Sequence, residues 1–346
     1  MREDATHRIH APHCLWITSY PQATASITQR TQFPRTVRTV SPHPTPLPQT
    51  LAVHGFTCAQ AFAAGVTRNR LRASDLCAPY WGVRAAANTS DPLAHIRAAA
   101  PFLSSHQALA SISAAQLLGL PLPSRLRDHP ELIVASPVSA ARSKRHGVRP
   151  MRMRNDRFAT VRFEGIPILT PRALAASLSR DLDSTELTVV LDALCSEARN
   201  YPGRRYRAQA LLTSEEIRKI PQQFARMHGI ATLREACEQA ESGVESPMET
   251  VLRVQLISAG FPKPEINATI RLSNGRTTRP DLLYRDARVL IEYLGDHHRT
   301  DRSTWEHDVE RSRDLAAAGY IELQVTASDL QQPRFGRLVA RLRQLL

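Results

Sequence analysis

Two apolar segments joined by a short polar turn constrain this chain more than any other feature. Residues 281–284 (DLLY) and 289–293 (VLIEY) have the length and composition of strands, and residues 285–288 (RDAR) are suited to a turn between them. A two-residue hairpin loop within that turn would place Asp281 opposite Glu292. The sequence therefore predicts an antiparallel hairpin that holds two facing carboxylates.

Facing carboxylates inside a hairpin need a compensating positive charge. Opposed side chains of an antiparallel pair are about 4.5–5.5 Å apart at Cβ, so the two acids repel one another. Burying them without a counter-charge costs several kcal/mol. A divalent cation bound by both acids would offset the repulsion, because Mg²⁺ and Mn²⁺ prefer oxygen ligands. Ion pairs with neighbouring arginines at a strand edge would do the same, and geometry does not decide between the two.

The segments around the hairpin predict a mixed α/β layer architecture. A capping box over residues 246–249, with proline at the first helical position, begins a helix that ends at Gly260. A strand over 265–272 follows, and then the hairpin. A second helix over 303–318 and a strand over 320–325 complete the segment. The order is helix, three strands, helix, strand.

This order of elements resembles the PD-(D/E)XK nuclease core, the restriction-endonuclease-like α-β-β-β-α-β fold. The residues resemble those of its very-short-patch-repair-endonuclease-like branch, a bacterial domain-of-unknown-function family. The order and spacing of the shared residues carry the resemblance, because no single motif among them is specific. The similarity covers about 243–325, with matching positions at Ser246, Pro247, Glu249, Arg253, Pro280, Asp281, Glu292, Gly295, His298, Asp308, Arg311, Leu315 and Gly319.

The resemblance implies a metal-dependent DNA endonuclease, a hydrolase, with Mg²⁺ or Mn²⁺ bound by Asp281 and Glu292. It also implies catalytic roles for Glu249 and His298. Glu249 has an ordinary explanation as well, as a helix cap and as the i+4 partner of Arg253. The residues expected to support the site are Asp308, Arg311 and Arg253. The residue expected to contact DNA is Arg299.

The chain departs from the nuclease pattern at Leu294. The parent motif reads acid–any–lysine, and close relatives within the branch more often carry an acid at this place. A leucine side chain can neither activate water nor bind a metal ion. Asp296, His297 or His298 could supply the missing group, because a histidine near a metal can act as base or ligand. The alternative function is therefore a non-catalytic DNA-binding regulator that keeps a degenerate nuclease fold.

Residues 55–85 (GFTCAQAFAAGVTRNRLRASDLCAPYWGVRA) predict a helix-turn-helix with a wing. Thr57 is placed to cap a first helix, residues 65–66 turn the chain, and Thr67 is placed to cap a second helix. The segment YWGVRA predicts the strand of the wing. The expected core residues of this module are Phe56, Phe62, Leu71 and Leu76.

The second of these helices carries Arg68, Arg70 and Arg72. The module resembles the winged N-terminal domain of abortive-infection type IV antitoxins. The resemblance implies that these arginines bind double-stranded DNA and that a cognate toxin protein is a further partner. An ordinary helical pair with solvated arginines is the alternative.

The whole chain is expected to be of the α+β or mixed α/β class. Residues 142–157 hold seven basic residues, which suit either a phosphate contact or a solvated basic hairpin. Five parts are expected: a disordered or wrongly started tail over 1–50, the winged module over 51–88, an antitoxin-like α/β segment over 89–200, a helical linker over 201–242 and the endonuclease-like domain over 243–346.

Composition agrees with a nucleic-acid partner. The net charge is +13 and the pI about 10.3, a balance that favours polyanions. Five scattered cysteines form no CxxC pair and no zinc spacing. No signal peptide and no membrane-spanning run is visible, so a cytoplasmic location is expected. Aromatic residues make up only 5%, which favours duplex DNA over stacking on single strands, and RNA is the weaker expectation.

Overall fold

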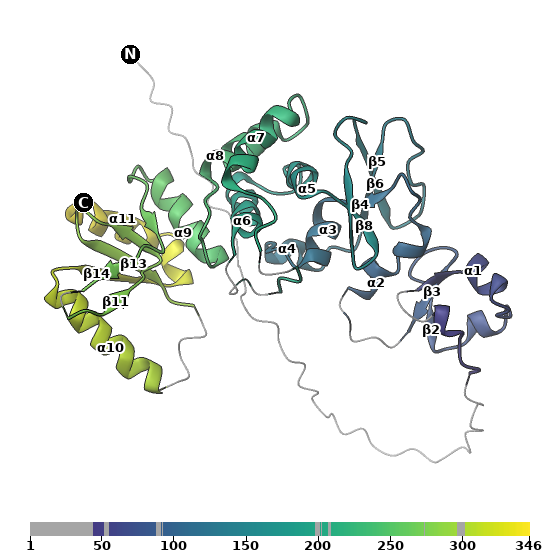
Figure 1. Ribbon diagram of the computed structural model, residues 1–346, viewed down its shortest axis with the longest axis horizontal. Helices are drawn as coiled ribbons and strands as arrows, with labels where there is room; N and C mark the ends of the chain where they lie inside the picture. Colours follow the sequence, from purple (N-terminus) through teal and green to yellow (C-terminus); the bar gives the residue numbers. More distant parts are fainter. Residues whose placement is uncertain are drawn as a thin grey trace. The chain divides into compact units, whose positions relative to one another are not determined.

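The computed structural model describes residues 44–51, 55–87, 91, 93–197, 201, 203–206, 209–272, 274–295 and 302–346, with only the backbone described for 302–309. The chain forms two compact units (Figure 1). We call Leu118–Asp128 together with Pro171–Leu346 the C-terminal unit, and the described parts of Ser19–Leu117 together with His129–Thr170 the N-terminal unit.

The N-terminal unit begins with a turn, η1 (Gln49–Leu51), and a small antiparallel sheet in the order β1-β3-β2. Its strands are β1 (Phe56–Thr57), β2 (Leu76–Cys77) and β3 (Val83–Ala86). The first predicted helix is confirmed as α1 (Cys58–Ala63), because Thr57 and Gln60 form a reciprocal capping box. Phe56 and Leu71 are buried as expected, but the prediction for Phe62 is wrong, since 47% of it is exposed.

The second predicted helix of this module is reduced to a single 3₁₀ turn, η2 (Arg70–Arg72). Thr67 Oγ1 accepts a hydrogen bond from the Arg70 backbone N at 3.2 Å, as a cap would. The chain then becomes extended at Ala73, with ψ of 149°, and enters β2. Three residues are too few for a helix that could lie along a DNA groove.

A five-stranded sheet forms the rest of the N-terminal unit, in the order β6-β5-β4-β8-β7. Strands β5 and β6 pair in parallel, so the basic segment of residues 142–157 does not form a hairpin with β5. The elements are α2 (Ala94–Arg97), η3 (Ala100–Phe102), β4 (Ala108–Leu109), α3 (Ser111–Leu118), β5 (Leu132–Pro137), β6 (Val148–Met153), β7 (Thr160–Phe163) and β8 (Ile166–Leu169).

The C-terminal unit opens with a bundle of helices. The helices expected at Pro171 and Ser184 are confirmed, the second with a capping box between Asp183 and Glu186. The stretch expected as a linker contains two helices that pack on these. No described helix has the length and apolar content to cross a membrane. The bundle consists of α4 (Ser124–Arg127), α5 (Pro171–Leu178), α6 (Ser184–Cys195), α7 (Ser214–Gln223) and α8 (Ile230–Gln239).

A four-stranded mixed sheet in the order β14-β13-β12-β9 follows the bundle. The predicted hairpin is confirmed, with β12 and β13 antiparallel, while β13 and β14 are parallel. A two-stranded ribbon of β10 and β11 lies beside it in sequence. The elements are α9 (Pro247–Ser258), β9 (Glu265–Ile266), β10 (Ile270–Arg271), β11 (Thr277–Thr278), β12 (Leu282–Tyr284), β13 (Val289–Tyr293), α10 (Arg302–Ala317), β14 (Ile321–Val325), η5 (Ala327–Leu330) and α11 (Arg334–Leu345).

The continuous strand expected over 265–272 is broken into β9 and β10. Asn267 adopts a φ of 48°, a left-handed conformation that no strand residue takes. Strand β9 therefore pairs with β12, whereas β10 turns away to pair with β11. The mixed α+β class is confirmed. The C-terminal segment runs α9, β9, the β10–β11 ribbon, β12, β13, α10, β14, η5 and α11.

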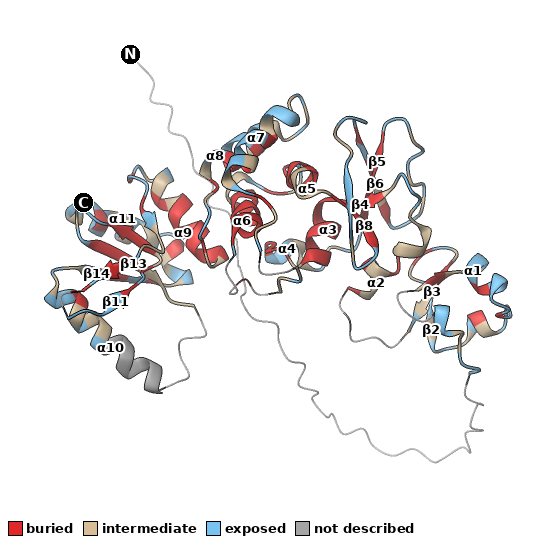
Figure 2. Ribbon diagram, in the orientation of Figure 1, coloured by how far each residue is buried: buried red, intermediate tan, exposed pale blue. Residues whose placement is uncertain are grey.

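Both faces of the four-stranded sheet are covered by helices. Alternate strand residues such as Ile291 and Leu323 pack with α9 and α11 in one apolar cluster. The intervening residues Leu283 and Leu290 pack with Leu315 of α10 in another. Figure 2 shows the resulting buried interior along β13 and α9. Glu292 of β13 lies on the same side of the sheet as Leu290 and therefore faces α10, whereas Glu265 of β9 and Gln324 of β14 are exposed.

Candidate active site

Asp281 and Glu292 face one another on the α10 side of the sheet. The register pairs Leu282 with Ile291, and its continuation places Asp281 opposite Glu292, as the sequence predicted. Asp281 directly precedes β12, and its Oδ2 accepts a hydrogen bond from the Tyr293 backbone N at 2.6 Å. The hairpin thus holds both carboxylates at the same end of the sheet.

Glu249 adds a third carboxylate from the first turn of α9. Ser246 Oγ accepts a hydrogen bond from the Glu249 backbone N at 3.3 Å, so the expected helix cap is present. The reciprocal bond is shifted by one residue, because Glu249 Oε2 accepts from the Glu245 backbone N at 3.0 Å. The same oxygen accepts from Asn267 Nδ2 at 3.0 Å. Glu249 itself is only 5% exposed.

The three acids perturb one another. Burial is the main reason that the pKa of Glu249, the pKa of Asp281 and the pKa of Glu292 each rise to about 7. Repulsion adds to it around the whole group. Glu249 raises the pKa of Asp281, Asp281 raises that of Glu292, and Glu292 raises that of Glu249. The three side chains therefore form one electrostatic unit, which we call the acid cluster.

Arg311 of α10 is a counter-charge to this cluster. Its Nη1 donates to Glu292 Oε1 at 2.5 Å, and its Nη2 donates to Glu322 Oε1 at 2.7 Å. Glu322 lies in β14, and its other oxygen accepts from Ser312 Oγ at 2.5 Å. Glu322 was not predicted as a site residue, although an acid inside the apolar segment YIELQV is the same signal that identified Glu292. Arg311 thus shares its positive charge between two carboxylates.

Each acid of the cluster has one carboxylate oxygen that could bind a cation. Asp281 Oδ1, Glu292 Oε2 and Glu249 Oε1 accept no hydrogen bond from the described residues. Carboxylate oxygens are the donors that Mg²⁺ and Mn²⁺ take, so Asp281 and Glu292 fit such an ion chemically. Across the described residues, no group of three or more Asp, Glu, His or Cys side chains is gathered tightly enough to hold an ion as it stands.

Arg253 belongs to a different contact. Its Nη2 donates to Asp192 Oδ2 of α6 at 2.7 Å, and its Nη1 donates to the Gln239 carbonyl O at 2.7 Å. The expected i+4 pair with Glu249 is therefore replaced by an ion pair between α6 and α9. Thr250 Oγ1 also donates to Asp192 Oδ2, at 2.7 Å, and the Glu241 backbone N donates to Oδ1 at 2.7 Å.

The Asp192 pair is buried almost completely, with side-chain exposures of 1% for Arg253 and 0% for Asp192. Burial raises the pKa of Asp192 to about 6, although Arg253 and the other donors oppose the rise. The pair fixes two helices against one another. A supporting role for Arg253 in chemistry would have to act through this contact.

Some expected site residues lie outside the described part of the chain. They are His298, Arg299, Asp296 and His297, and for Asp308 only the helical backbone is described. Leu294 is described, and its backbone N donates to the Val325 carbonyl O at 2.7 Å, which extends the β13–β14 pairing by one step. The position that departs from the nuclease pattern is thus held by main-chain pairing beside the acid cluster.

Buried thiols of the C-terminal unit are poorly suited to nucleophilic chemistry. Burial raises the pKa of Cys195 and the pKa of Cys237 to about 12, so both remain thiols at neutral pH. The raised pKa values and the burial of the two thiols indicate a structural role for both cysteines.

The three arginines expected to bind DNA differ in their surroundings. Arg68 and Arg72 are exposed. Arg70 is not free, because it forms a two-point ion pair with Asp75 at 2.9 and 2.7 Å and also donates to the Thr45 carbonyl O at 2.5 Å. Its side chain is only 11% exposed. Arg70 therefore holds the chain together, and two of the three arginines remain open to a phosphate.

Several basic residues of the 142–157 segment also serve the fold. Arg145 donates to the Trp81 carbonyl O at 2.7 Å and stacks on Phe102, with 4.5 Å from guanidinium carbon to ring centroid. Arg152 donates to the Ala140 carbonyl O at 2.6 Å. The basic composition of this segment is thus explained in part by bonds within the N-terminal unit.

Comparison with known proteins identifies uncharacterized relatives. The chain is similar to two proteins of Mycobacterium tuberculosis, one from each of two strains, both described only as uncharacterized. Each is 26% identical over 266 residues, which is 76% of this chain and 89% of the relative. No family model matches the chain. No solved structure matches it either.

Proposed function

We propose that the C-terminal unit hydrolyses phosphodiester bonds of double-stranded DNA in the presence of Mg²⁺ or Mn²⁺. The acid cluster carries the proposal. Burial, with mutual repulsion added, raises the pKa of each of the three carboxylates to about 7, so they destabilise the folded chain when they ionise. Arg311 pairs directly with Glu292. Such an arrangement is costly for stability and typical of a site that awaits a cation.

Asp281 and Glu292 would hold the ion, which when bound polarises the phosphate and lowers the pKa of its water. Arg311 fixes one oxygen of Glu292, so the rotation of that carboxylate is restricted before any ligand arrives. Glu249, with a pKa of about 7, is able to take up or release a proton near neutral pH. By resemblance, His298 would lie near the reaction centre and Asp308 would support the site from α10. His298 would then assist the proton transfer, and Arg299 or Arg311 would steady the phosphate.

Within the proposal, the N-terminal unit holds the DNA. Arg68 and Arg72 are its exposed candidates for phosphate contacts, while Arg70 acts only by keeping the module folded. The winged-helix and antitoxin-like character of this unit, its cytoplasmic location and a cognate toxin partner are part of the same proposal. They rest on the sequence resemblance and on the net charge of +13.

A nicking assay on supercoiled plasmid DNA tests the proposed function. The parent chain should nick with millimolar Mg²⁺ and should be inactive in a chelator. Asp281→Asn should lower the rate by about 100-fold or more, since each 1.4 kcal/mol of lost transition-state stabilisation costs tenfold. The matched control is Asp286→Asn, the same change at an exposed position in the turn of the same hairpin, and it should keep parental activity. Equal activity of the two variants would refute the proposal.

A non-catalytic DNA-binding regulator of antitoxin type is the second candidate function. Leu294 favours it, because an apolar residue stands where the nuclease pattern has a polar one and only its backbone is used in the sheet. A regulator should bind duplex DNA equally well with chelator and with Mg²⁺, and it should not nick under either condition. A metal-dependent nick by the purified chain would exclude this alternative.

A further inference from the structure

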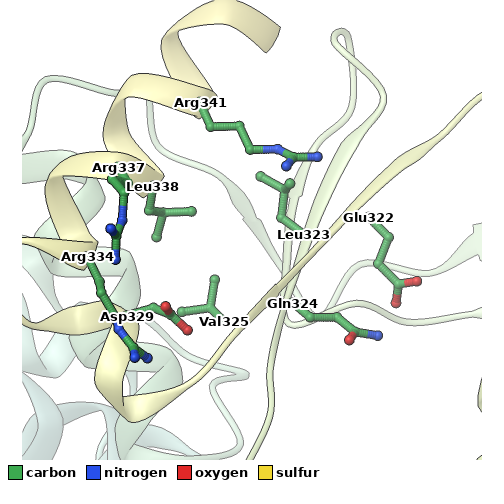
Figure 3. Close-up of a pocket in the computed structure, with 9 residues that line it drawn as sticks. All are labelled: Glu322, Leu323, Gln324, Val325, Asp329, Arg334, Arg337, Leu338 and Arg341. Atoms are coloured by element: carbon green, nitrogen blue, oxygen red, sulfur yellow. The ribbon is translucent and has the colours of Figure 1, made fainter.

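A groove lined by arginines lies beside β14, the outer strand in the order β14-β13-β12-β9. It has a volume of about 290 Å³. Figure 3 shows Arg334, Arg337 and Arg341 reaching into it from α11, with Gln324 of β14 and Asp329 among the other lining residues. The three arginines follow one side of the helix at spacings of three and four residues, which places them in a row.

These arginines are not used by the fold. The apolar side of α11 packs on the sheet through Leu342 and its partly buried neighbours Phe335 and Leu338, whereas the arginines are exposed. Their side chains form no hydrogen bond or ion pair with the described residues, although the charges of Arg334 and Arg337 act on Asp329. The nearby Asp329 is already bound, because its Oδ2 accepts from Thr326 N at 2.9 Å and from Thr326 Oγ1 at 2.6 Å. The groove therefore offers an excess of positive charge to an anion.

The groove lies on the α11 side of β14, and its lining includes residues of β14 that reach the acid cluster on the α10 side. Strands β13 and β14 run in parallel, and Glu292 is paired with Gln324, which lines the groove. Neighbouring strands are about 4.8 Å apart, so the groove begins one strand away from the cluster. Glu322 belongs to both places, since it lines the groove and accepts from Arg311, the residue that holds Glu292.

We propose that Arg334, Arg337 and Arg341 hold phosphates of the DNA strand whose reacting phosphate lies at the acid cluster. From the first to the third arginine the helix rises about 10.5 Å. That distance equals about three base-pair steps of a duplex, each of which rises about 3.4 Å along the duplex axis. Guanidinium groups bind phosphate oxygens in a two-point geometry, which suits a backbone track without sequence preference. The inference rests on the proposed function and adds the path of the substrate strand.

Binding of a fluorescein-labelled 20-base-pair duplex by the full chain, in chelator and over a range of salt concentrations, tests this path. The test variant combines Arg334→Gln, Arg337→Gln and Arg341→Gln. The matched control combines Arg218→Gln, Arg234→Gln and Arg343→Gln, which removes the same charge from exposed positions of the same unit outside the groove. All six side chains are exposed, so thermal melts of both variants should match the parent.

The test variant should flatten the slope of log affinity against log salt by roughly 0.9 for each lost phosphate contact, two to three units in all. The control should keep the parental slope. Lysine at the three groove positions should restore the slope, because the slope counts charge, but should leave binding weaker because lysine lacks the two-point contact.

Equal flattening in the test and control variants would show that only net charge matters and would overturn the groove assignment. A parental slope in the test variant, in a chain that binds and nicks DNA, would overturn the groove while leaving the proposed function intact. A parent chain that binds no duplex at all would overturn both.

Discussion

Asp192 and the acid cluster, both in the C-terminal unit, differ in how their buried or half-buried carboxylates are paired. At the first, Asp192 has donors on both oxygens: Arg253 and Thr250 on one and the Glu241 backbone on the other. At the second, Glu249, Asp281 and Glu292 raise one another's pKa, and Arg311 pairs with Glu292 while also neutralising Glu322. Both oxygens of Asp192 accept hydrogen bonds, whereas the three carboxylates of the acid cluster share Arg311 with Glu322.

The difference separates an element of the fold from a site. A buried carboxylate with donors on both oxygens orders two helices and has no oxygen left for a ligand. An acid cluster with unused oxygens and raised pKa values keeps a capacity for protons or cations that the folded chain alone does not fill. Changes to the first should therefore be felt mainly in stability, and changes to the second mainly in ligand response.

The largest effect is expected at the satisfied pair. Arg253→Met should lower the free energy of unfolding by about 3–5 kcal/mol, because it leaves Asp192 buried without its counter-charge. Arg311→Met should cost less, since Glu292 and Glu322 are 15% and 12% exposed and Glu292 titrates near pH 7. Urea unfolding of the two variants at pH 7 measures the difference. An equal or larger loss for Arg311→Met would make the acid cluster a structural salt-bridge element.

A smaller effect is expected in the pH dependence of stability. The folded pKa values of the acid cluster, about 7, lie above the ordinary values of 3.8 and 4.5, so the folded chain keeps protons that the unfolded chain releases. Stability should therefore fall as the pH rises toward and through 7. In chelator the melting temperature should drop by several degrees between pH 5 and pH 8.

Amide variants supply the control for this pH profile. Glu249→Gln, Asp281→Asn and Glu292→Gln together should flatten it above pH 6, leaving the part that Asp192 contributes through its own raised pKa of about 6. Millimolar Mg²⁺ should oppose the fall in the parent but not in the amide variant, because the ion binds the ionised acids. A profile that stays steep in the amide variant would place the titration elsewhere.

The smallest effect is expected for Asp281→Asn alone, measured without metal. The substitution keeps the oxygen that accepts from Tyr293 N and removes one of the facing charges. Relief of like-charge repulsion should leave stability unchanged or raise it by about 1 kcal/mol. A thermal melt in chelator and in millimolar Mg²⁺ checks this, with the parent gaining stability from the metal and the variant losing most of that gain. Destabilisation of the metal-free variant by several kcal/mol would contradict the site.

Local signals in the sequence predicted local structure well. Thr57 with Gln60 and Ser246 ahead of Glu249 cap the helices that were expected there, because a cap depends on residues three apart. The hairpin register that places Asp281 opposite Glu292 follows from turn length alone. These parts of the candidate site were within reach of sequence reasoning.

Contacts between segments that are far apart in the sequence could not be predicted. The parallel pairing of β5 with β6 and the partner of Arg253 depend on segments brought together only by folding. Asn267 has a left-handed conformation that ends β9. It lies in residues 265–272, which contain no glycine or proline that would indicate a break in the strand. The second helix of the winged module was predicted from its cap and apolar spacing, but the chain becomes extended after three residues. Tertiary packing overrode a weak local preference.

The contact between α6 and α9 also bears on how this chain can change by recombination. A gene segment that began near Gly243 would carry Arg253 and Thr250 but leave Asp192 behind, together with Val189, which packs in the same apolar cluster as Leu252. The transplanted helix would bring a buried guanidinium without its carboxylate into any new host. Transfer of the acid cluster without α6 should therefore lower the stability of α9 in its new setting.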